Sequence, residues 1–303
     1  MTAPVAAQRI LRGAAAAITT QFLDQDGEST DSVGPVTVDV TRGDGTSIAT
    51  GAPTTSDGNV HTYSLAAEDN DRLDLLRLDW RDAGDVRMTT YCDVVGGFFF
   101  TVAEVRAFDP RIDNNLANDA KVRQLRREVE DSCERITGTA WVPRYRRLNI
   151  KPADNIGRGW NTLPLNLDVW APRVIRSVRV YTDGTNYSAL SPAELASITL
   201  REWGALERAD TGAWLNSAGG TVLEVEHGYD QPTSELKHAA LTHLRYLAYR
   251  EKTGIPDRAT TYTPEGGGYF TIATPGVGPF ETGLPDVDAV YKRHKVASDI
   301  GIA

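Results

Sequence analysis

Residues 101–147 decide the fold of this chain of 303 residues, and they read TVAEVRAFDPRIDNNLANDAKVRQLRREVEDSCERITGTAWVPRYRR. A short amphipathic run, Val102–Phe108, follows Thr101 and stops before Pro110. Threonine is a favoured N-cap and proline ends helices, so we predict a first helix capped by Thr101. A loop, a long charged helix and a basic extended exit complete the stretch. We interpret it as a scaffold on which the rest of the chain is organised.

The long helix is predicted to begin at Asn118 or Asp119 as N-cap and to end at Gly138 in the C′ position. Its apolar residues recur at steps of three and four and form one narrow stripe, namely Val122, Leu125, Val129, Cys133 and Ile136. The other faces carry charges of both signs. They form either a solvated surface or flanks that meet a neighbouring copy of the helix.

The segment before this scaffold is predicted to be all β. Short alternating runs, such as 36–40, 60–65 and 76–80, are separated by polar turns, which is typical of an immunoglobulin-like sandwich of about 90 residues. Cys92 falls on the inward face of the last strand, so we interpret it as a core residue. Residues 1–12 are predicted to be a poorly ordered or strand-exchanging arm.

The region after the scaffold alternates again between strand and helix signals. Residues 148–228 have β character, with a clear strand at 174–181 and a helical turn capped by Ser191. A second long helix is predicted from about Pro232 to Thr253, where Gly254 ends it. Residues 255–303 are rich in Gly and Pro, and a short helix is expected only at 287–295. An extended tail of this kind should dock on something.

Composition indicates an ordinary globular protein, with 41% hydrophobic and 24% charged residues. We expect no signal peptide and no membrane span, because no apolar run approaches the required length of about 18 residues. Two cysteines are too few for a disulfide framework or a Cys-rich zinc site, which favours a reducing compartment. Residues 1–100 hold seven Arg, no Lys and fifteen Asp or Glu, a net charge of −8, which argues against nucleic-acid binding there.

No constellation of catalytic, cofactor-binding or metal-ligating residues emerges, and we expect the protein not to be an enzyme. His238 and His243 are five positions apart and do not share a helical face as a metal pair would. No H-E-x-x-H, G-x-S-x-G or phosphate-binding Gly-rich loop occurs. Arg42-Gly43-Asp44 is an adhesion-like tripeptide, but it lies where a hairpin turn is expected.

Four stretches together resemble the head-to-tail connector, or adaptor, proteins of tailed bacteriophages. These stretches are FFFTVAEVRAFDP from residue 98, DAKVRQLRREVEDSCERITGTAWVPR from 119, VEHGYDQPTSELKHAALTHLRYLAYREKTG from 225, and TGLPDVDAVYKRHK from 282. In that family the first long helix ends in an Ile-Thr-Gly-like turn, and the second follows a Gly-Tyr-x-x-Pro-like step. Here these are residues 136–138 and 228–232. The last stretch and the VVGGFFF exit at 94–100 are similar to connectors of siphophage type from actinobacterial hosts.

The resemblance implies a multidomain α+β fold. It consists of an immunoglobulin-like sandwich at 1–97, a connector domain at 98–254 with two long helices and a β insert at about 148–228, and an extended C-terminal arm at 255–303. The front domain and the insert are additions to the compact connectors.

The resemblance also implies a structural role in the virion neck, after assembly in the host cytoplasm. Such adaptors form a ring, usually of twelve copies, beneath the portal ring. They extend the DNA channel without reading the DNA sequence, and they carry the stopper or tail-terminator protein. Two groups of contact residues follow. The tail contacts with the portal or a neighbour are Leu284, Val287, Tyr291, Lys292 and Arg293. The inter-subunit contacts on the long helix are Arg123, Arg126, Arg127, Glu130 and Glu134.

Three alternatives remain open at this point. One is an adhesion or carbohydrate-binding protein built on the immunoglobulin-like domain, which would bind glycan or host cells through residues 1–97 alone. Another is a different neck protein, a stopper or a tail-completion protein. A hydrolase is the third, although no usable constellation of residues supports it.

Overall fold

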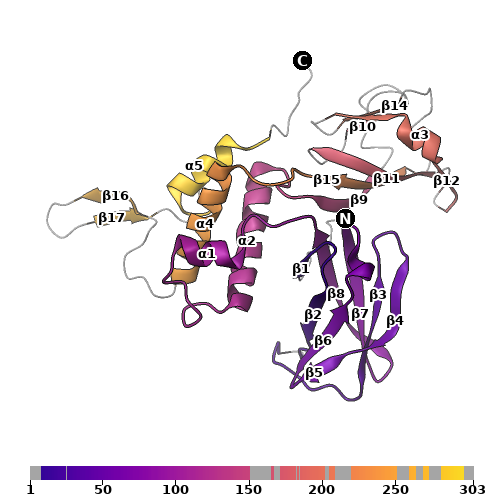
Figure 1. Cartoon of the computed structure of the whole chain (residues 1–303), viewed down its shortest axis with the longest axis horizontal. Coiled ribbons are helices and arrows are strands. Elements are labelled where there is room, and N and C mark those ends of the chain that lie inside the picture. Colours follow the sequence, from indigo (N-terminus) through magenta and orange to yellow (C-terminus); the bar gives the residue numbers. More distant parts are fainter. Residues whose placement is uncertain are drawn as a thin grey trace. The chain divides into compact units, whose positions relative to one another are not determined.

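The computed structural model has a mixed α+β fold with several sheets and five α-helices among the residues it describes (Figure 1). These residues are 8–24, 26–150, 165–166, 171–181, 183, 185–201, 205–208, 220–250, 259–263, 269–272 and 281–296. The chain divides into two compact units, of which the first comprises 1–97 and 143–228 and the second comprises 98–142 and 229–303. The three-part division predicted from the sequence remains a prediction.

The first unit begins with two sheets around one core. Its strands are β1 (Gln8–Leu11), β2 (Ala16–Gln21), β3 (Val36–Thr41), β4 (Ser47–Pro53), β5 (Thr55–Asp57), β6 (Val60–Leu65), β7 (Asp74–Asp82) and β8 (Asp85–Val95), with a 3-10 turn, η1 (Glu68–Asn70), before β7. One sheet has the order β1-β8-β7-β3-β4 and the other β2-β6-β5. Alternation along each strand explains the core. Val38 of β3 and Leu78 and Trp80 of β7 are fully buried, whereas their neighbours within the same strands are half-buried or exposed.

Residues 1–12 were predicted to be a poorly ordered or strand-exchanging arm, but part of this segment is a strand of the chain's own sheet. Residues 8–11 form β1, which pairs in parallel with β8 of the same chain, Gln8 lying opposite Cys92. Residues 1–7 lie outside the described residues. Sequence reasoning missed β1 because a four-residue edge strand carries almost no periodic signal.

Cys92 is buried in the core as predicted, and burial raises the pKa of its thiol to about 12.

A second pair of sheets completes the first unit. Its elements are β9 (Arg144–Ile150), β10 (Leu165–Asn166), β11 (Pro172–Tyr181), β12 (Tyr187–Ala189), α3 (Pro192–Ala196), β13 (Ile198–Leu200), β14 (Ala205–Arg208) and β15 (Thr221–His227). The sheet orders are β12-β11-β15-β9 and β10-β14-β13. The helical turn predicted at Ser191 is α3, and the Ser191 side chain and Glu194 cap it reciprocally.

The strands of 143–228 are tied to the front sheets by a network around the Arg42-Gly43-Asp44 turn. Asp74 accepts the Gly43 N–H at 2.9 Å and lies 3.5 Å from the Arg42 guanidinium. The Arg147 side chain donates to the Gly43 carbonyl at 2.9 Å. A Cβ on Gly43 would lie only 2.6 Å from the Tyr145 ring, so only glycine fits here. The tripeptide is therefore a structural turn, as the sequence predicted.

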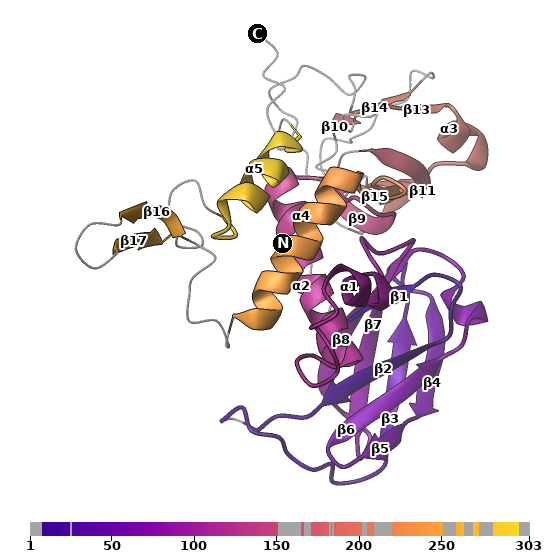
Figure 2. The same cartoon turned by 60° about the vertical axis from the view of Figure 1, so that its left-hand side comes forward.

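The second unit is helical. Its helices are α1 (Val102–Phe108), α2 (Asp119–Thr137), α4 (Ser234–Tyr249) and α5 (Pro285–Arg293), and a hairpin is formed by β16 (Ala259–Thr263) and β17 (Tyr269–Ile272). Both views show α2, α4 and α5 side by side (Figures 1 and 2), and one apolar core runs through all four helices. None of the helices described is long and apolar enough to cross a membrane.

Two predictions for this unit need correction. The second long helix starts at Ser234, because the Thr233 side chain accepts the Leu236 N–H as N-cap, and it ends at Tyr249. The part of the predicted helix from 251 lies outside the described residues. The region expected to be extended contains the β16–β17 hairpin. By contrast, α5 matches the short helix expected near 287–295.

Candidate functional site

Helix α2 has the local structure that its sequence predicts. The Asn118 side chain accepts the Lys121 N–H at 2.9 Å as N-cap, and Gly138 adopts φ 75° at the C-terminal end, where its N–H bonds to Glu134. The predicted apolar stripe is buried, but the buried face is wider than that stripe because Arg126 and Glu130 also lie within it. Contacts with neighbouring groups compensate the burial of these two charged side chains.

Arg126 and Glu130 hold the segment that enters the helical unit. Glu130 accepts the backbone N–H of Phe99 at 2.9 Å, and Arg126 donates to the Phe100 carbonyl at 3.1 Å. The Arg126 guanidinium lies 3.5 Å from the centroid of the Phe98 ring, a cation–π geometry. The two side chains are also an i, i+4 ion pair at 3.9 Å. Both predicted inter-subunit residues therefore make contacts within their own chain.

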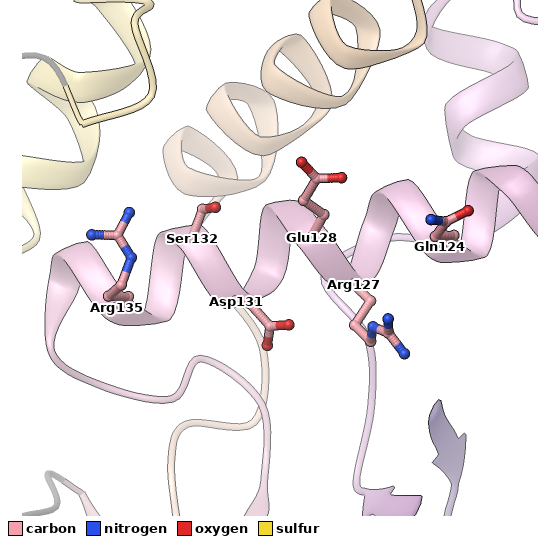
Figure 3. Close-up of a pocket in the computed structure, with 6 residues that line it drawn as sticks. All are labelled: Gln124, Arg127, Glu128, Asp131, Ser132 and Arg135. Carbon is pink, nitrogen blue, oxygen red and sulfur yellow. The ribbon is translucent and has the colours of Figure 1, made fainter. Parts of the chain in front are cut away.

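The opposite side of α2 is an open polar face. Figure 3 shows its six side chains along the helix, where they line a shallow hollow of about 320 Å³. They are Gln124, Arg127, Glu128, Asp131, Ser132 and Arg135. Of these, Arg135 forms an ion pair with Glu281 at 2.9 Å. We call these six residues the α2 polar face. It carries both charge signs and contains no His or Cys, so its chemistry suits association through hydrogen bonds and ion pairs.

Three of the five predicted helix contacts remain accessible. Arg123 is exposed, and Arg127 and Glu134 are half-buried. Sequence reasoning grouped them with Arg126 and Glu130 and missed most of the α2 polar face. The helical period carried the missing signal, since positions 124, 128, 131 and 135 lie opposite the apolar stripe.

The predicted tail contacts belong to α5 and the residue before it. Leu284, Val287 and Tyr291 are buried in the core of the helical unit, whereas Lys292 and Arg293 are exposed. Arg293 pairs with Glu235 of α4, and the His294 Nε2 lies 3.1 Å from the same carboxylate. The Val296 N–H donates to the Thr137 carbonyl at 2.8 Å. Thus α5 packs against α2 and α4 of its own chain, and its contact with a portal or a neighbour stays a prediction.

Buried polar atoms accompany α5 at this interface. The His243 Nδ1, the Tyr291 hydroxyl and the Asp288 Oδ2 have no hydrogen-bond partner among the described residues. Burial lowers the pKa of His243 to about 4, because a charged imidazole would lose its hydration there. His243 is therefore neutral in the folded protein near pH 7.

Stability should depend on pH through His243. An unfolded imidazole binds its proton near pH 6.5, whereas the folded one resists protonation down to about pH 4. The stabilisation is thus complete above about pH 7 and is lost as the pH falls. We expect a loss of about 2 kcal/mol between pH 6.5 and pH 5 from this group. Urea titrations followed by helical circular dichroism test this, and His243→Phe should flatten the dependence. An equally steep dependence in the variant would contradict the assignment.

In the described part of the chain, no group of three or more His, Cys, Asp or Glu residues could hold a metal ion. Cys92 and Cys133 are both free and buried, and burial raises the pKa of each thiol. Burial likewise lowers the pKa of His227 to about 3.

Comparisons with known proteins give structural likenesses only. No family model matches the chain, and no curated protein matches it. Similar solved structures include a chain in the neck of an empty GTA particle with C6 symmetry, with a TM-score of 0.45 and 16% identity over 67% of this chain and 92% of that one. A chain in the neck of the native GTA particle with C12 symmetry has a TM-score of 0.41 and 16% identity over 66% and 90%.

A third such structure is the virion of the native gene transfer agent (GTA) particle, where one chain has a TM-score of 0.44 and 15% identity over 67% of this chain and 92% of that one. At this level of similarity the likenesses assign neither a family nor a function to the chain.

Proposed function

We propose that this chain is a head-to-tail adaptor of a tailed-phage virion. Identical copies, twelve in the usual case, form a ring beneath the portal in the virion neck. The ring extends the DNA channel, receives a stopper or tail-terminator protein, and leaves the DNA sequence unread. The mechanism is association rather than catalysis, and assembly takes place in the host cytoplasm.

One observation carries the proposal: the stretches that resemble connectors come together in a single helical core. They lie at 98–110, 119–144, 225–254 and 282–295, yet each contributes residues to the core of the second unit. The segment that follows the first long helix also contacts the segment that precedes the second. The Trp141 and Tyr229 rings are stacked with centroids 4.9 Å apart, and the Tyr229 N–H bonds to the Ala140 carbonyl. This arrangement supports an adaptor core in which the two long helices and the C-terminal helix are one body.

The α2 polar face supports association between copies. A ring requires two different surfaces that complement each other, one on each side of every copy. Accessible side chains of both signs, such as the half-buried Arg127 and the exposed Glu128, can pair with opposite charges on a neighbour. We therefore assign the inter-subunit role to Arg123, Arg127 and Glu134 together with this face. Arg126 and Glu130 act by keeping α2 in place.

The tail has two kinds of residue in this proposal. Lys292 and Arg293 are exposed and meet the portal or a neighbouring copy directly. Leu284, Val287 and Tyr291 would do so only if α5 left its own core. The front domain, with two sheets around one core, is taken as an immunoglobulin-like addition to the compact connectors.

The adhesion-like tripeptide gives the adhesion alternative no support. Arg42 and Asp44 are each paired within the front domain, Arg42 with Asp71 and Asp74 and Asp44 with Arg72. A receptor would have to break these ion pairs to reach the tripeptide. The first binding partner distinguishes the two kinds of neck protein. An adaptor binds the portal ring first, whereas a stopper or tail-completion protein binds another partner first.

Native mass spectrometry tests the proposal, using the full chain alone and mixed with the portal ring from the same genome. We expect a complex with about one copy per portal subunit. Reversing the charge of Arg123 and Arg127 to Glu should lower the yield of complete rings at least about tenfold, since like charges would then face each other. Arg12→Glu, at an exposed arginine of the front domain, is the matched control and should assemble normally. No association with an intact portal ring would overturn the adaptor role.

A further inference from the structure

The loops at one end of the front sheets form a continuous surface. Their described residues are 22–24, 26–34, 54–61 and 82–88, in the segments that join β2 to β3, β4 to β6, and β7 to β8. The Asn59 amide donates to the Ser29 hydroxyl at 2.6 Å, and Arg87 donates to the Asp31 carbonyl at 2.9 Å. The N–H groups of Val33 and Gly34 both donate to Asp82. We call these three loops the tip surface.

The tip surface lies far from the network around Asp74. Strands β3, β7 and β8 each have one end in the tip loops and the other end near Gly43, Asp74 or Val95. The contacts with β9 and β11 are made at that second end. The tip surface is thus left uncovered by the rest of its own unit.

Exposed aliphatic side chains gather at the tip surface. Its large exposed hydrophobics are Leu23, Val33, Val60 and Val86, with exposed fractions of 54%, 87%, 38% and 47%. Exposed apolar side chains scattered singly are normal, but these four are concentrated on three hydrogen-bonded loops at one end of the front sheets. Phe22, by contrast, is buried beneath the Arg87 guanidinium, 4.6 Å from its ring centroid. The patch therefore offers aliphatic contact and not the aromatic platform on which sugars stack.

Negative charge is concentrated on the same loops. The tip surface contains seven acidic residues and one arginine, a net charge of −6 out of −8 for residues 1–100. Arg87 pairs with the buried Asp82 at 2.6 Å. The other six carboxylates are exposed and have no ion-pair partner among the residues described, namely Asp24, Asp26, Glu28, Asp31, Asp57 and Asp85. Such a surface repels nucleic acid and attracts cations.

We propose that the tip surface is a docking site for a basic protein surface, whose Lys and Arg side chains meet the six carboxylates and whose apolar side chains meet the four exposed aliphatic residues on the same loops. Charge complementarity identifies the partner as basic, because six exposed carboxylates on the same loops favour Lys and Arg side chains opposite them, and protein interfaces combine apolar and polar contacts. The proposal does not depend on the adaptor role, since it concerns the end of the front sheets remote from β9 and β11.

A binding titration with the full chain tests the proposal. The probe is a fluorescent peptide in which lysine alternates with leucine, and a second peptide has glutamate in place of lysine. We expect the lysine peptide to bind and the glutamate peptide not to bind. Val33→Ser with Val86→Ser should weaken binding about tenfold, as should Asp24→Asn with Asp31→Asn. Only the carboxylate variant should flatten the dependence of affinity on salt, because screening acts on the charged pairs.

Matched controls separate the tip surface from general acidity. Val174 is 48% exposed in the other half of the unit, so Val174→Ser matches Val86→Ser. Glu68→Gln with Asp286→Asn neutralises two exposed carboxylates elsewhere. Equal affinity in the tip variants and these controls overturns the proposal. Self-association of the chain that is lost in the tip variants also overturns it, in favour of a second copy as the occupant. Circular dichroism verifies that each variant is folded.

Discussion

Glu130→Ala is expected to destabilise the helical unit by about 3 kcal/mol, one of the two largest effects foreseen for a single substitution. Glu130 is fully buried, and it accepts the Phe99 N–H while facing the Arg126 guanidinium. Its removal takes the acceptor from a buried N–H and the carboxylate from beside a buried cation, and both losses carry a desolvation cost. Hydrogen exchange across α2, measured in increasing urea, gives the free energy of opening of this unit.

Glu128→Ala is the control for this experiment. Glu128 is on the same helix and carries the same carboxylate, but it is exposed on the α2 polar face. Its loss should change the stability of α2 by no more than about 0.5 kcal/mol. If Glu130→Ala left the opening energy of α2 unchanged while abolishing assembly, Glu130 would be an inter-subunit contact and the intramolecular assignment would fail.

Asp74→Ala should destabilise the first unit by about 3 kcal/mol as well. The Asp74 carboxylate is buried and binds the Gly43 N–H, and it lies within 3.5 Å of Arg42 and 3.2 Å of Arg72. Without it, the turn that packs against Tyr145 loses its anchor. Exchange should therefore accelerate in β3 and β9 together, because the Gly43 turn also receives the Arg147 side chain.

Asp71→Ala provides the comparison for Asp74. Asp71 pairs with the same Arg42 guanidinium at 3.5 Å, but its side chain is 66% exposed. Exposed ion pairs contribute little, so a loss of at most about 0.5 kcal/mol is expected. Equal effects of the two substitutions would show that the network around Asp74 does not depend on burial.

Sequence patterns were informative wherever a few neighbouring residues decide the outcome. The Thr101 and Asn118 caps, the Gly138 terminus of α2 and the capped turn at Ser191 were all predicted, and the structure confirms them. Capping and helical periodicity act within one or two turns, so the sequence contains the whole cause. The short strands β1 and β5 were missed because three or four residues show no period, and pairing with a neighbour creates them.

The candidate site was predicted only in part for a related reason. A charged residue on a helix is exposed by default, and Arg123 follows that rule. Arg126 and Glu130 do not, because a segment about 30 residues earlier in the chain supplies a ring, a carbonyl and an N–H that compensate their burial. No local pattern around α2 encodes that partner.

By itself, then, the sequence determined the capped starts of α1, α2 and α3, the Gly138 end of α2, several of the longer strands, the Arg42-Gly43-Asp44 turn, and the acidic bias of the front domain. Only the tertiary structure decided that residues 143–228 join that domain through Asp74 and Tyr145, and that the acidic residues gather with Leu23 and Val33 at one end. The physical reason is that local propensity acts over a few residues, whereas burial and charge clustering depend on which distant segments the fold brings together.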